Sequence, residues 1–280
     1  MPTYKEQRRK KLNMIFFFLI AIPIVIFLYN PEMFDFLSEK AQTGIQKIKN
    51  QIPKNLREEG ELLSEDELAK KFTYTSVESA LQAFKPRKLS LTAKNLEYVP
   101  TNLQKLKYLQ VLNLDKNQLK ELVLPADSLR YLQYLSISLN RIKKLPVEIG
   151  KLENLVRLDA TANLLNSLPL EIVNLKKLRT LNLRYNQFEQ IPTHLCDLEE
   201  LDSLMLGFNQ IARLPRAMVN LRKLEYLDLE YNRDLDIVHF IDDFKHFQNL
   251  KTLRLTGIKI SEADKKRIRE VVSEKTQVIF

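Results

Sequence analysis

Residues 178–192 read LRTLNLRYNQFEQIP, and the spacing of their apolar residues returns along most of the chain. Leu181 and Leu183 alternate with polar residues, which is the period of a β-strand with one buried face. Asn186 and Pro192 stand where such a strand has to end. A repeat of this kind determines the architecture of the whole chain.

The central leucine of the stretch recurs at a fixed interval. Each occurrence comes 23 residues after the one before, and the last comes after 26. The aligned leucines, which number units one to eight, are Leu89, Leu112, Leu135, Leu158, Leu181, Leu204, Leu227 and Leu253. One unit cannot bury its leucines alone, so the units are expected to stack as a solenoid. After the strand, apolar residues in each unit follow at intervals of three. This spacing predicts a tight helical or 3₁₀-like segment, here called the return, that leads back to the start of the next strand.

Two further columns of the repeat are interpreted as structural. The first column is asparagine, whose buried amide can donate to and accept from backbone groups that lose their partners where the chain leaves the strand. Its members are Asn117, Asn140, Asn163, Asn186, Asn209 and Asn232. The second column is proline, which lacks the N–H that strand pairing needs and so helps to end the pairing. Its members are Pro100, Pro146, Pro169, Pro192 and Pro215.

The unit L-x-x-L-x-L-x-x-N-x-L-x-x-L-P-x-x-I-x-x-L-x-x-L resembles the leucine-rich-repeat family over residues 86–260. It is the 23-residue type with Leu-Pro after the turn, similar to Ras-binding and plant disease-resistance-like leucine-rich repeats. The resemblance implies an α/β fold, namely a curved solenoid of eight repeats with a concave parallel sheet and helical caps at both ends. Those relatives bind other proteins, so the resemblance also implies a protein partner.

Both ends of the repeat region carry sequences that suit caps. Residues 76–85 predict a helix that covers the first strand, because a bare sheet edge invites association. At the other end, Ser261 and Asp264 resemble an acidic capping box that opens a helix, and residues 277–280 predict a last strand within the cap at 261–280. Unit seven departs from the period by extra residues around 234–244.

The N-terminus predicts a membrane segment. Residues 1–11 form a basic tail, and residues 12–29 form an apolar run that spans about 27 Å as a helix. No small-residue cleavage site follows Tyr29, which favours a retained signal-anchor. The basic tail then places the N-terminus in the cytoplasm and the repeats on the outer side. A secreted or periplasmic protein, released by signal cleavage, is the alternative.

Residues 30–75 are expected to connect the membrane segment to the repeats. Apolar residues from Phe34 to Ile48 keep helical spacing among charged neighbours, which predicts an amphipathic stalk. Residues 54–68 are rich in glutamate and are interpreted as an acidic linker or a short exposed helix.

The net charge of +9 does not indicate a nucleic-acid partner. Residues 1–11 carry about +4 and the repeats about +6, but acidic residues are interspersed with the basic ones throughout the repeats. A mixed surface of this kind is typical of a solvated face, so no nucleic-acid binding is predicted.

The sequence predicts no catalytic, cofactor-binding or metal-binding residue. His194 and Cys196 are two apart, so on a helical turn they do not face each other as a base and a nucleophile would. His239 and His246 are interpreted as part of an ordinary helix that packs its phenylalanines inward. The chain is therefore interpreted as a non-enzyme.

The strand face is predicted to be the binding surface, because its outward residues alternate with the buried leucines. Beside the asparagines, Tyr185, Phe208 and Tyr231 follow one another in three units and are expected to stack at the concave rim. The predicted partner-binding residues are Tyr134, Arg157, Asp159, Arg184, Tyr185, Met205, Phe208, Tyr226, Asp228, Glu230 and Tyr231.

The function favoured by these observations is that of a membrane-anchored protein-binding module or scaffold. A structural spacer of an envelope assembly is the first alternative, and an enzyme with an unrecognised site is the second.

Overall fold

The computed structural model describes residues 61–83 and 85–280. The predicted tail, the predicted membrane segment at 12–29 and most of the predicted stalk lie outside these residues. Within the part of the chain that is described, no helix is both long and apolar enough to cross a membrane.

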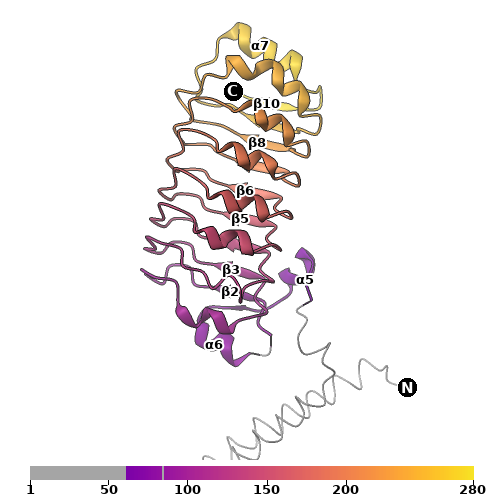
Figure 1. The fold of residues 1–280 in the computed structure, drawn as a ribbon. Helices are drawn as coiled ribbons and strands as arrows, with labels where there is room; N and C mark the ends of the chain where they lie inside the picture. The colour runs from indigo at the N-terminus through magenta and orange to yellow at the C-terminus, as the bar shows by residue number, and fades with distance from the viewer. Residues whose placement is uncertain (1–60, 84) are drawn as a thin grey trace, which may run out of the picture. The chain divides into compact units, whose positions relative to one another are not determined.

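A single parallel sheet of ten strands runs through the described residues in chain order (Figure 1). The sheet is curved and does not close on itself, so its two edges lie at opposite ends of the solenoid. The strands are β1 (Thr73–Tyr74), β2 (Lys88–Ser90), β3 (Val111–Asn113), β4 (Tyr134–Ser136), β5 (Arg157–Asp159), β6 (Thr180–Asn182), β7 (Ser203–Met205), β8 (Tyr226–Asp228), β9 (Thr252–Arg254) and β10 (Gln277–Ile279).

The strand register confirms the alignment of the repeat. Leu158 pairs with Leu181, and Leu181 pairs with Leu204. All the central leucines from Leu89 to Leu253 occupy successive rungs in this way. A slip of one residue would turn every leucine to the solvent, so burial on one face fixes the register.

The predicted returns are 3₁₀ helices, and they run along the side opposite the strands. They are η2 (Thr101–Lys105), η3 (Val147–Lys151), η4 (Leu170–Asn174), η5 (Thr193–Asp197), η6 (Arg216–Asn220) and η7 (Val238–His246). Each of the repeat prolines directly precedes one of the first five, and the Pro192 carbonyl, for example, accepts a hydrogen bond from Leu195 at 3.0 Å. The proline therefore starts the return helix. In unit two, where the proline is displaced to Pro125, a turn replaces the 3₁₀ helix.

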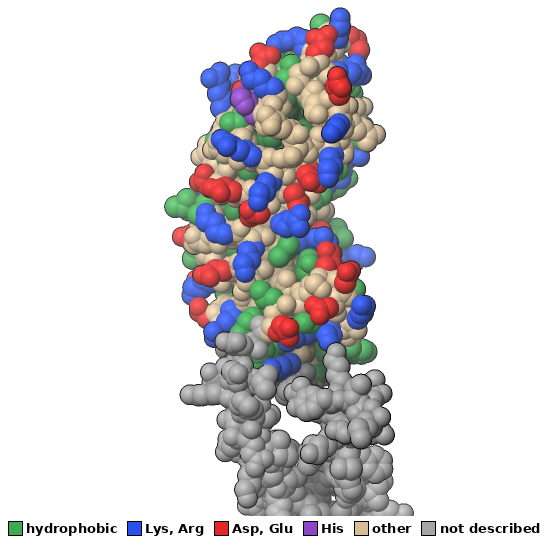
Figure 2. Space-filling model, turned by 90° about the vertical axis from the view of Figure 1, so that its right-hand side faces the viewer, with side chains coloured by type: hydrophobic (Ala, Val, Ile, Leu, Met, Phe, Trp, Pro, Cys, Tyr) green, Lys and Arg blue, Asp and Glu red, His purple; other side chains and the backbone are tan. Residues whose placement is uncertain are grey.

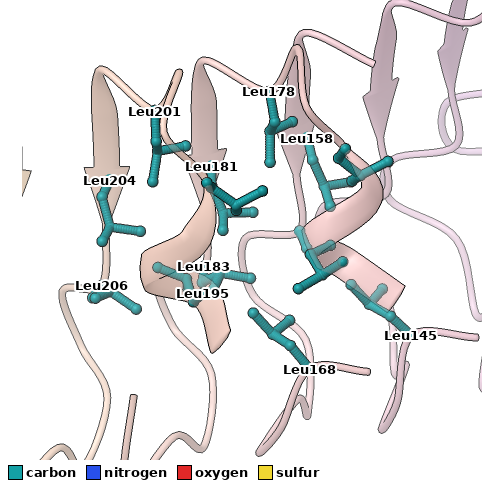
Figure 3. Close-up of a cluster of buried hydrophobic side chains, with 14 of the residues drawn as sticks. Leu145, Leu158, Leu168, Leu178, Leu181, Leu183, Leu195, Leu201, Leu204 and Leu206 are labelled. Atoms are coloured by element: carbon teal, nitrogen blue, oxygen red, sulfur yellow. The ribbon is translucent and has the colours of Figure 1, made fainter. Parts of the chain in front are cut away.

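The core is a column of leucines between the sheet and the returns. Leu181 and Leu183 come from one strand and its exit, whereas Leu178 and Leu195 come from the approach to the strand and from η5 (Figure 3). All four are fully buried. Burial of one such side chain contributes about 1.5–3 kcal/mol, so the stacked units supply the stability that a single unit lacks.

The N-terminal cap contains more than the predicted helix. Helix α6 (Val77–Gln82) begins after Ser76 as predicted. Before it, helix α5 (Glu65–Ala69) has a capping box formed by Ser64 and Glu67, and β1 adds a strand to the edge at β2. Helix α5 thus begins in the range predicted to be an acidic linker or a short exposed helix, and β1 is a strand within the region 30–75 that was predicted to connect the membrane segment to the repeats.

The C-terminal cap agrees with the sequence prediction. Helix α7 (Glu262–Val271) begins after Ser261, whose side chain accepts a hydrogen bond from the Asp264 N–H. Strand β10 then pairs with β9. The extra residues of unit seven form the long helix η7, and it buries Phe240 and Phe244 inward.

The asparagine column connects adjacent units, as its chemistry predicts. The Asn186 amide donates to the carbonyls of Ala160, Leu183 and Arg184 at 3.0–3.1 Å. Its oxygen accepts from the Leu165 N–H at 2.9 Å. Because similar bonds recur at the other asparagines from Asn117 to Asn232, one side chain type satisfies the turn in units two to seven.

We expect Asn186→Ala to lower the free energy of unfolding by about 2–4 kcal/mol, because it leaves several buried backbone groups without partners. Urea unfolding followed by circular dichroism measures the change. Asn166→Ala is the control, since Asn166 is exposed. Equal unfolding midpoints for the two variants would contradict this role.

Candidate functional site

Each unit has a residue in the left-handed backbone conformation at the point where the chain leaves the strand, and unit one has a second at Asn95. At the position common to all units, φ lies between 53° and 58° in units one to seven, and the residue is a glycine with φ 77° in unit eight. This rim column consists of Ala93, Lys116, Leu139, Ala162, Tyr185, Phe208, Tyr231 and Gly257. Because the backbone is the same in each unit, the side chains of the column project in the same direction.

Three aromatic residues of the rim column stack face to face, as predicted. The ring centroids of Tyr185 and Phe208 are 4.1 Å apart, and those of Phe208 and Tyr231 are 4.4 Å apart. The interplanar angles are 14° and 19°. We call these three residues the aromatic strip. Each contact contributes about 0.5–1.5 kcal/mol beyond simple burial, so the rings hold one another in place.

The geometry of the solenoid explains the stack. Neighbouring strands lie about 4.8 Å apart, which is close to the spacing of stacked rings. At the C-terminal end, a Cβ on Gly257 would come within 2.8 Å of the Tyr231 ring. Glycine therefore lets the last ring lie directly against the backbone of unit eight. The strip remains open to solvent, since Tyr185 is 48% and Tyr231 is 38% exposed.

Beside the aromatic strip, an ion network connects unit five to unit seven. The Arg184 guanidinium contacts Asp228 at 3.3 Å and pairs with Glu230. Arg254 of unit eight donates to Glu230 at 2.6 Å. Gly207 lies between these units, and a Cβ there would meet Glu230 at 2.9 Å. The missing side chain leaves room for the carboxylates of Asp228 and Glu230, with which Arg184 pairs from two units away.

The ion network also approaches the aromatic strip. The Arg184 guanidinium lies 5.8 Å from the Tyr185 ring centroid and 5.5 Å from that of Phe208. Such cation–π contacts are worth about 0.5–1 kcal/mol when exposed and more when desolvated. The network therefore restrains the rings from the side of the strand face.

Burial controls the chemistry of the acidic members of the network. Asp228 is fully buried and Glu230 nearly so. Burial raises the pKa of the Asp228 carboxyl above its ordinary value, while a hydrogen bond from the Glu230 N–H and the charge of Arg184 oppose the shift. Both acids were predicted as partner contacts, but a partner reaches them only by displacing Arg184 and Arg254.

The N-terminal half of the strand face is hydrogen-bonded within itself. The Asp159 carboxylate accepts from the Thr161 N–H at 3.0 Å and from the hydroxyls of Thr161 and Ser138. Asp115 accepts in the same way from Ser136 and from the Ser138 N–H. These acids satisfy backbone groups at the strand exits, so they are structural as well as surface residues.

Helix α5 contacts the same half of the strand face. Glu65 lies 3.6 Å from Arg157, and the Arg157 guanidinium lies 5.5 Å from the Tyr134 ring. The Leu63 backbone donates to Gln110 and accepts from Gln133. Tyr134 and Arg157, both predicted as contacts, thus lie beside the cap. The capping box at Ser64 was the available sequence signal for this helix.

The remaining predicted contacts lie in the C-terminal half. Met205 and Tyr226 are partly exposed on the strand face. Burial raises the pKa of the Tyr226 hydroxyl, with the Asp228 charge acting in the same direction. On the side of the molecule shown in Figure 2, basic and acidic side chains are interspersed over the described residues, as the charge pattern predicts.

In the two histidine clusters, Cys196 lies in the core and His239 has local partners, whereas the buried Nε2 of His194 has no hydrogen-bond partner among the described residues. Cys196 is buried in η5, and burial raises the pKa of its thiol to about 12, so the sulfur is protonated at neutral pH and is a poor nucleophile. His239 lies within 3.1 Å of the Leu214 carbonyl and 3.6 Å of Asp236. In the described ranges, no cluster of three potential metal ligands is present.

Comparison with known proteins agrees with this geometry. Residues 161–276 match the family described as "Leucine-rich repeat region". The fold is a leucine-rich-repeat solenoid. An internalin (inlF) from Listeria monocytogenes is similar with a TM-score of 0.58 and 24% identity, over 69% of this chain and 54% of the internalin. Internalin C2 (inlC2) from the same organism is similar with a TM-score of 0.56 and 25% identity, over 68% of this chain and 78% of that one.

A plant structure is also similar. It is the leucine-rich-repeat ectodomain of the membrane receptor kinase GASSHO1/SCHENGEN3 from Arabidopsis thaliana, in complex with CASPARIAN STRIP INTEGRITY FACTOR 2. The TM-score is 0.57 and the identity 25%, over 74% of this chain and 25% of the receptor ectodomain. The chain thus spans about half of the inlF structure and a quarter of this one. No curated protein sequence matches the chain.

We expect Arg184→Ala to lower the free energy of unfolding by about 1–3 kcal/mol at neutral pH, because the buried Asp228 loses the cation it pairs with and Glu230 keeps only Arg254. The pKa of Asp228 is already raised, so protonation in the folded state relieves the loss as the pH falls from neutral towards the ordinary range of a carboxyl. Urea unfolding at a series of pH values measures both effects.

Arg179→Ala is the matched control for this prediction. Arg179 pairs with Asp202 at 2.7 Å, but its side chain is 64% exposed, so removal is expected to change stability by less than about 1 kcal/mol. A loss at Arg184 that does not shrink with falling pH would contradict the role of Asp228.

Proposed function

We propose that this chain is a protein-recognition module whose principal contact is the aromatic strip. The observation that carries the proposal is the stack of Tyr185, Phe208 and Tyr231, in which Tyr185 and Tyr231 are exposed, Phe208 is partly exposed and the rings hold one another in place. Aromatic residues are enriched where interfaces gain most of their binding energy. A side chain that is already ordered loses little conformational entropy when a partner docks.

The strand face beside the strip supports the same function. Met205 and Tyr226 extend the partly exposed surface, and Arg184 provides a restrained cation next to the rings. The similar plant ectodomain is in complex with another molecule, which makes recognition a reasonable role for the fold in this chain. The proposed partner is a protein, and no catalytic step is involved.

We also propose that the module is held at a membrane by residues 12–29, with the N-terminus in the cytoplasm and the repeats on the outer side. This proposal rests on the sequence: an apolar run of bilayer length follows a basic tail. Anchoring would restrict the binding surface to the vicinity of the membrane.

The recognition proposal is tested by replacing Tyr185, Phe208 and Tyr231 together with serine in the full chain. Partners are captured from membranes by crosslinking and quantified by mass spectrometry. We expect one stoichiometric partner with the natural sequence and a loss of at least about tenfold with the variant, because the hot spot is removed. Unchanged capture would refute the aromatic strip as the contact.

The matched control replaces exposed apolar residues away from the strip. Tyr98 and Leu170 are 80% and 64% exposed, so Tyr98→Ser with Leu170→Ser removes apolar surface and leaves the rings in place. Capture by this variant should equal that of the natural chain. Absence of any stoichiometric partner for the natural chain would favour a structural spacer.

The anchoring proposal is tested by carbonate extraction of membranes. We expect the full chain to stay in the membrane pellet, because a retained apolar segment resists alkaline extraction. Release of the repeats as a soluble protein whose N-terminus lies near residue 30 would instead indicate signal cleavage.

A further inference from the structure

The rim column is interrupted next to the aromatic strip. Tyr185 is the first ring of the strip, and within the described residues it has a ring neighbour only on the side of Phe208. On its other side the column continues with Ala162 and then Leu139. Leu139 is 50% exposed and Ala162 is partly exposed. A short side chain therefore separates two large exposed ones.

The resulting notch has the thickness of one aromatic ring. Leu139 and Tyr185 are two units apart, which corresponds to about 9–10 Å along the sheet. Neighbouring rings of the strip lie 4.1 Å apart, so one ring inserted over Ala162 would continue the stack. We call the space over Ala162, between Leu139 and Tyr185, the ring notch.

The neighbouring turns carry basic side chains that form no ion pair within the described part of the chain. Units two and three carry five exposed cations after their strands, and these are Lys116, Lys120, Arg141, Lys143 and Lys144. None of them forms an ion pair with another described residue. Glu121 is the acidic residue on the same turns. This basic cluster begins in the rim column itself, at Lys116, two units before Ala162.

We propose that the ring notch and the basic cluster together bind an acidic protein segment that carries a tyrosine or a phenylalanine. The partner's ring stacks on Tyr185 over Ala162, and its carboxylates meet the cations of units two and three. The inference rests on the proposed recognition function and specifies the chemistry of the partner. In protein interfaces, aromatic anchors in preformed pockets usually supply most of the binding energy, and complementary charges at the rim contribute to specificity and to the rate of association.

The same features disfavour a single-stranded nucleic acid at this place. Such a ligand needs a basic groove that follows its backbone along the stacked bases. The corresponding turn of unit four, residues 162–167, carries no charged residue at all, and that of unit five carries only Glu189. The row of exposed cations is therefore interrupted at the turns of units four and five, and the corresponding turns of units six and seven carry only Arg213 and Arg233 as basic residues.

The test uses the full-length chain in detergent and a fluorescent acidic peptide with one central phenylalanine, observed by fluorescence anisotropy. Two comparison peptides replace the phenylalanine by alanine or the acidic residues by lysine, and an oligothymidylate serves as the nucleic-acid probe. We expect the phenylalanine peptide to bind at least about tenfold more tightly than either comparison peptide and the oligothymidylate. Its affinity should also fall with added salt.

Ala162→Phe provides the decisive variant, because its own ring fills the notch. Phe208 already shows that phenylalanine fits this backbone conformation. The matched control is Ala93→Phe, at the same column position with φ 54° but in unit one. We expect about tenfold weaker peptide binding for the first variant and no change for the second. Tyr185→Leu should weaken binding similarly, since it keeps bulk and removes the stacking face.

Three outcomes would overturn the inference: no peptide binding, equal binding of the phenylalanine and alanine peptides, or unchanged binding by Ala162→Phe. Preferential binding of the oligothymidylate would also overturn it. If the full chain still captures a stoichiometric membrane partner through the aromatic strip in any of these cases, only the ring notch is refuted. If that capture fails as well, the proposed function fails with it.

Discussion

The fold depends on one repeated interaction, the bridging of adjacent turns by an asparagine amide. A parallel strand of three residues ends abruptly, and the chain that leaves it carries buried backbone groups without sheet partners. At such a turn the two N–H hydrogens of the Asn186 amide are shared among three carbonyls, and its oxygen accepts one bond. The geometry of this turn places the residue before each asparagine in the left-handed conformation. The shared conformation aligns Tyr185, Phe208 and Tyr231. The candidate site is therefore a consequence of the turn chemistry.

Much of this arrangement could be predicted from the sequence, because it depends on spacing. The register, the 3₁₀ returns and the ring stack all follow from residues that recur at a constant interval, whereas the two predicted cap helices follow from local signals that begin at Ser76 and Ser261. The prolines illustrate a partial success: their position was clear, but their role as the start of each return helix follows only from the backbone hydrogen bonds.

Features that join distant residues through side-chain conformation were not predictable. The pairing of Arg184 with Glu230 requires the absence of a side chain at Gly207, and no period in the sequence indicates that an arginine reaches across a unit. The same applies to Leu63, which contacts Gln110 and Gln133 far along the chain. Asp228 is likewise buried, although the alternation of buried and outward residues along the strand had predicted it to be accessible.

The reach of Arg184 has a consequence for how the solenoid comes apart. Units of a solenoid interact mainly with their immediate neighbours, so such proteins can fray from an end one unit at a time. Arg184 joins unit five to unit seven, and Arg254 extends the connection to unit eight. Loss of the last units therefore disturbs the fifth directly. The C-terminal half, including the aromatic strip, should open and close as one cooperative block.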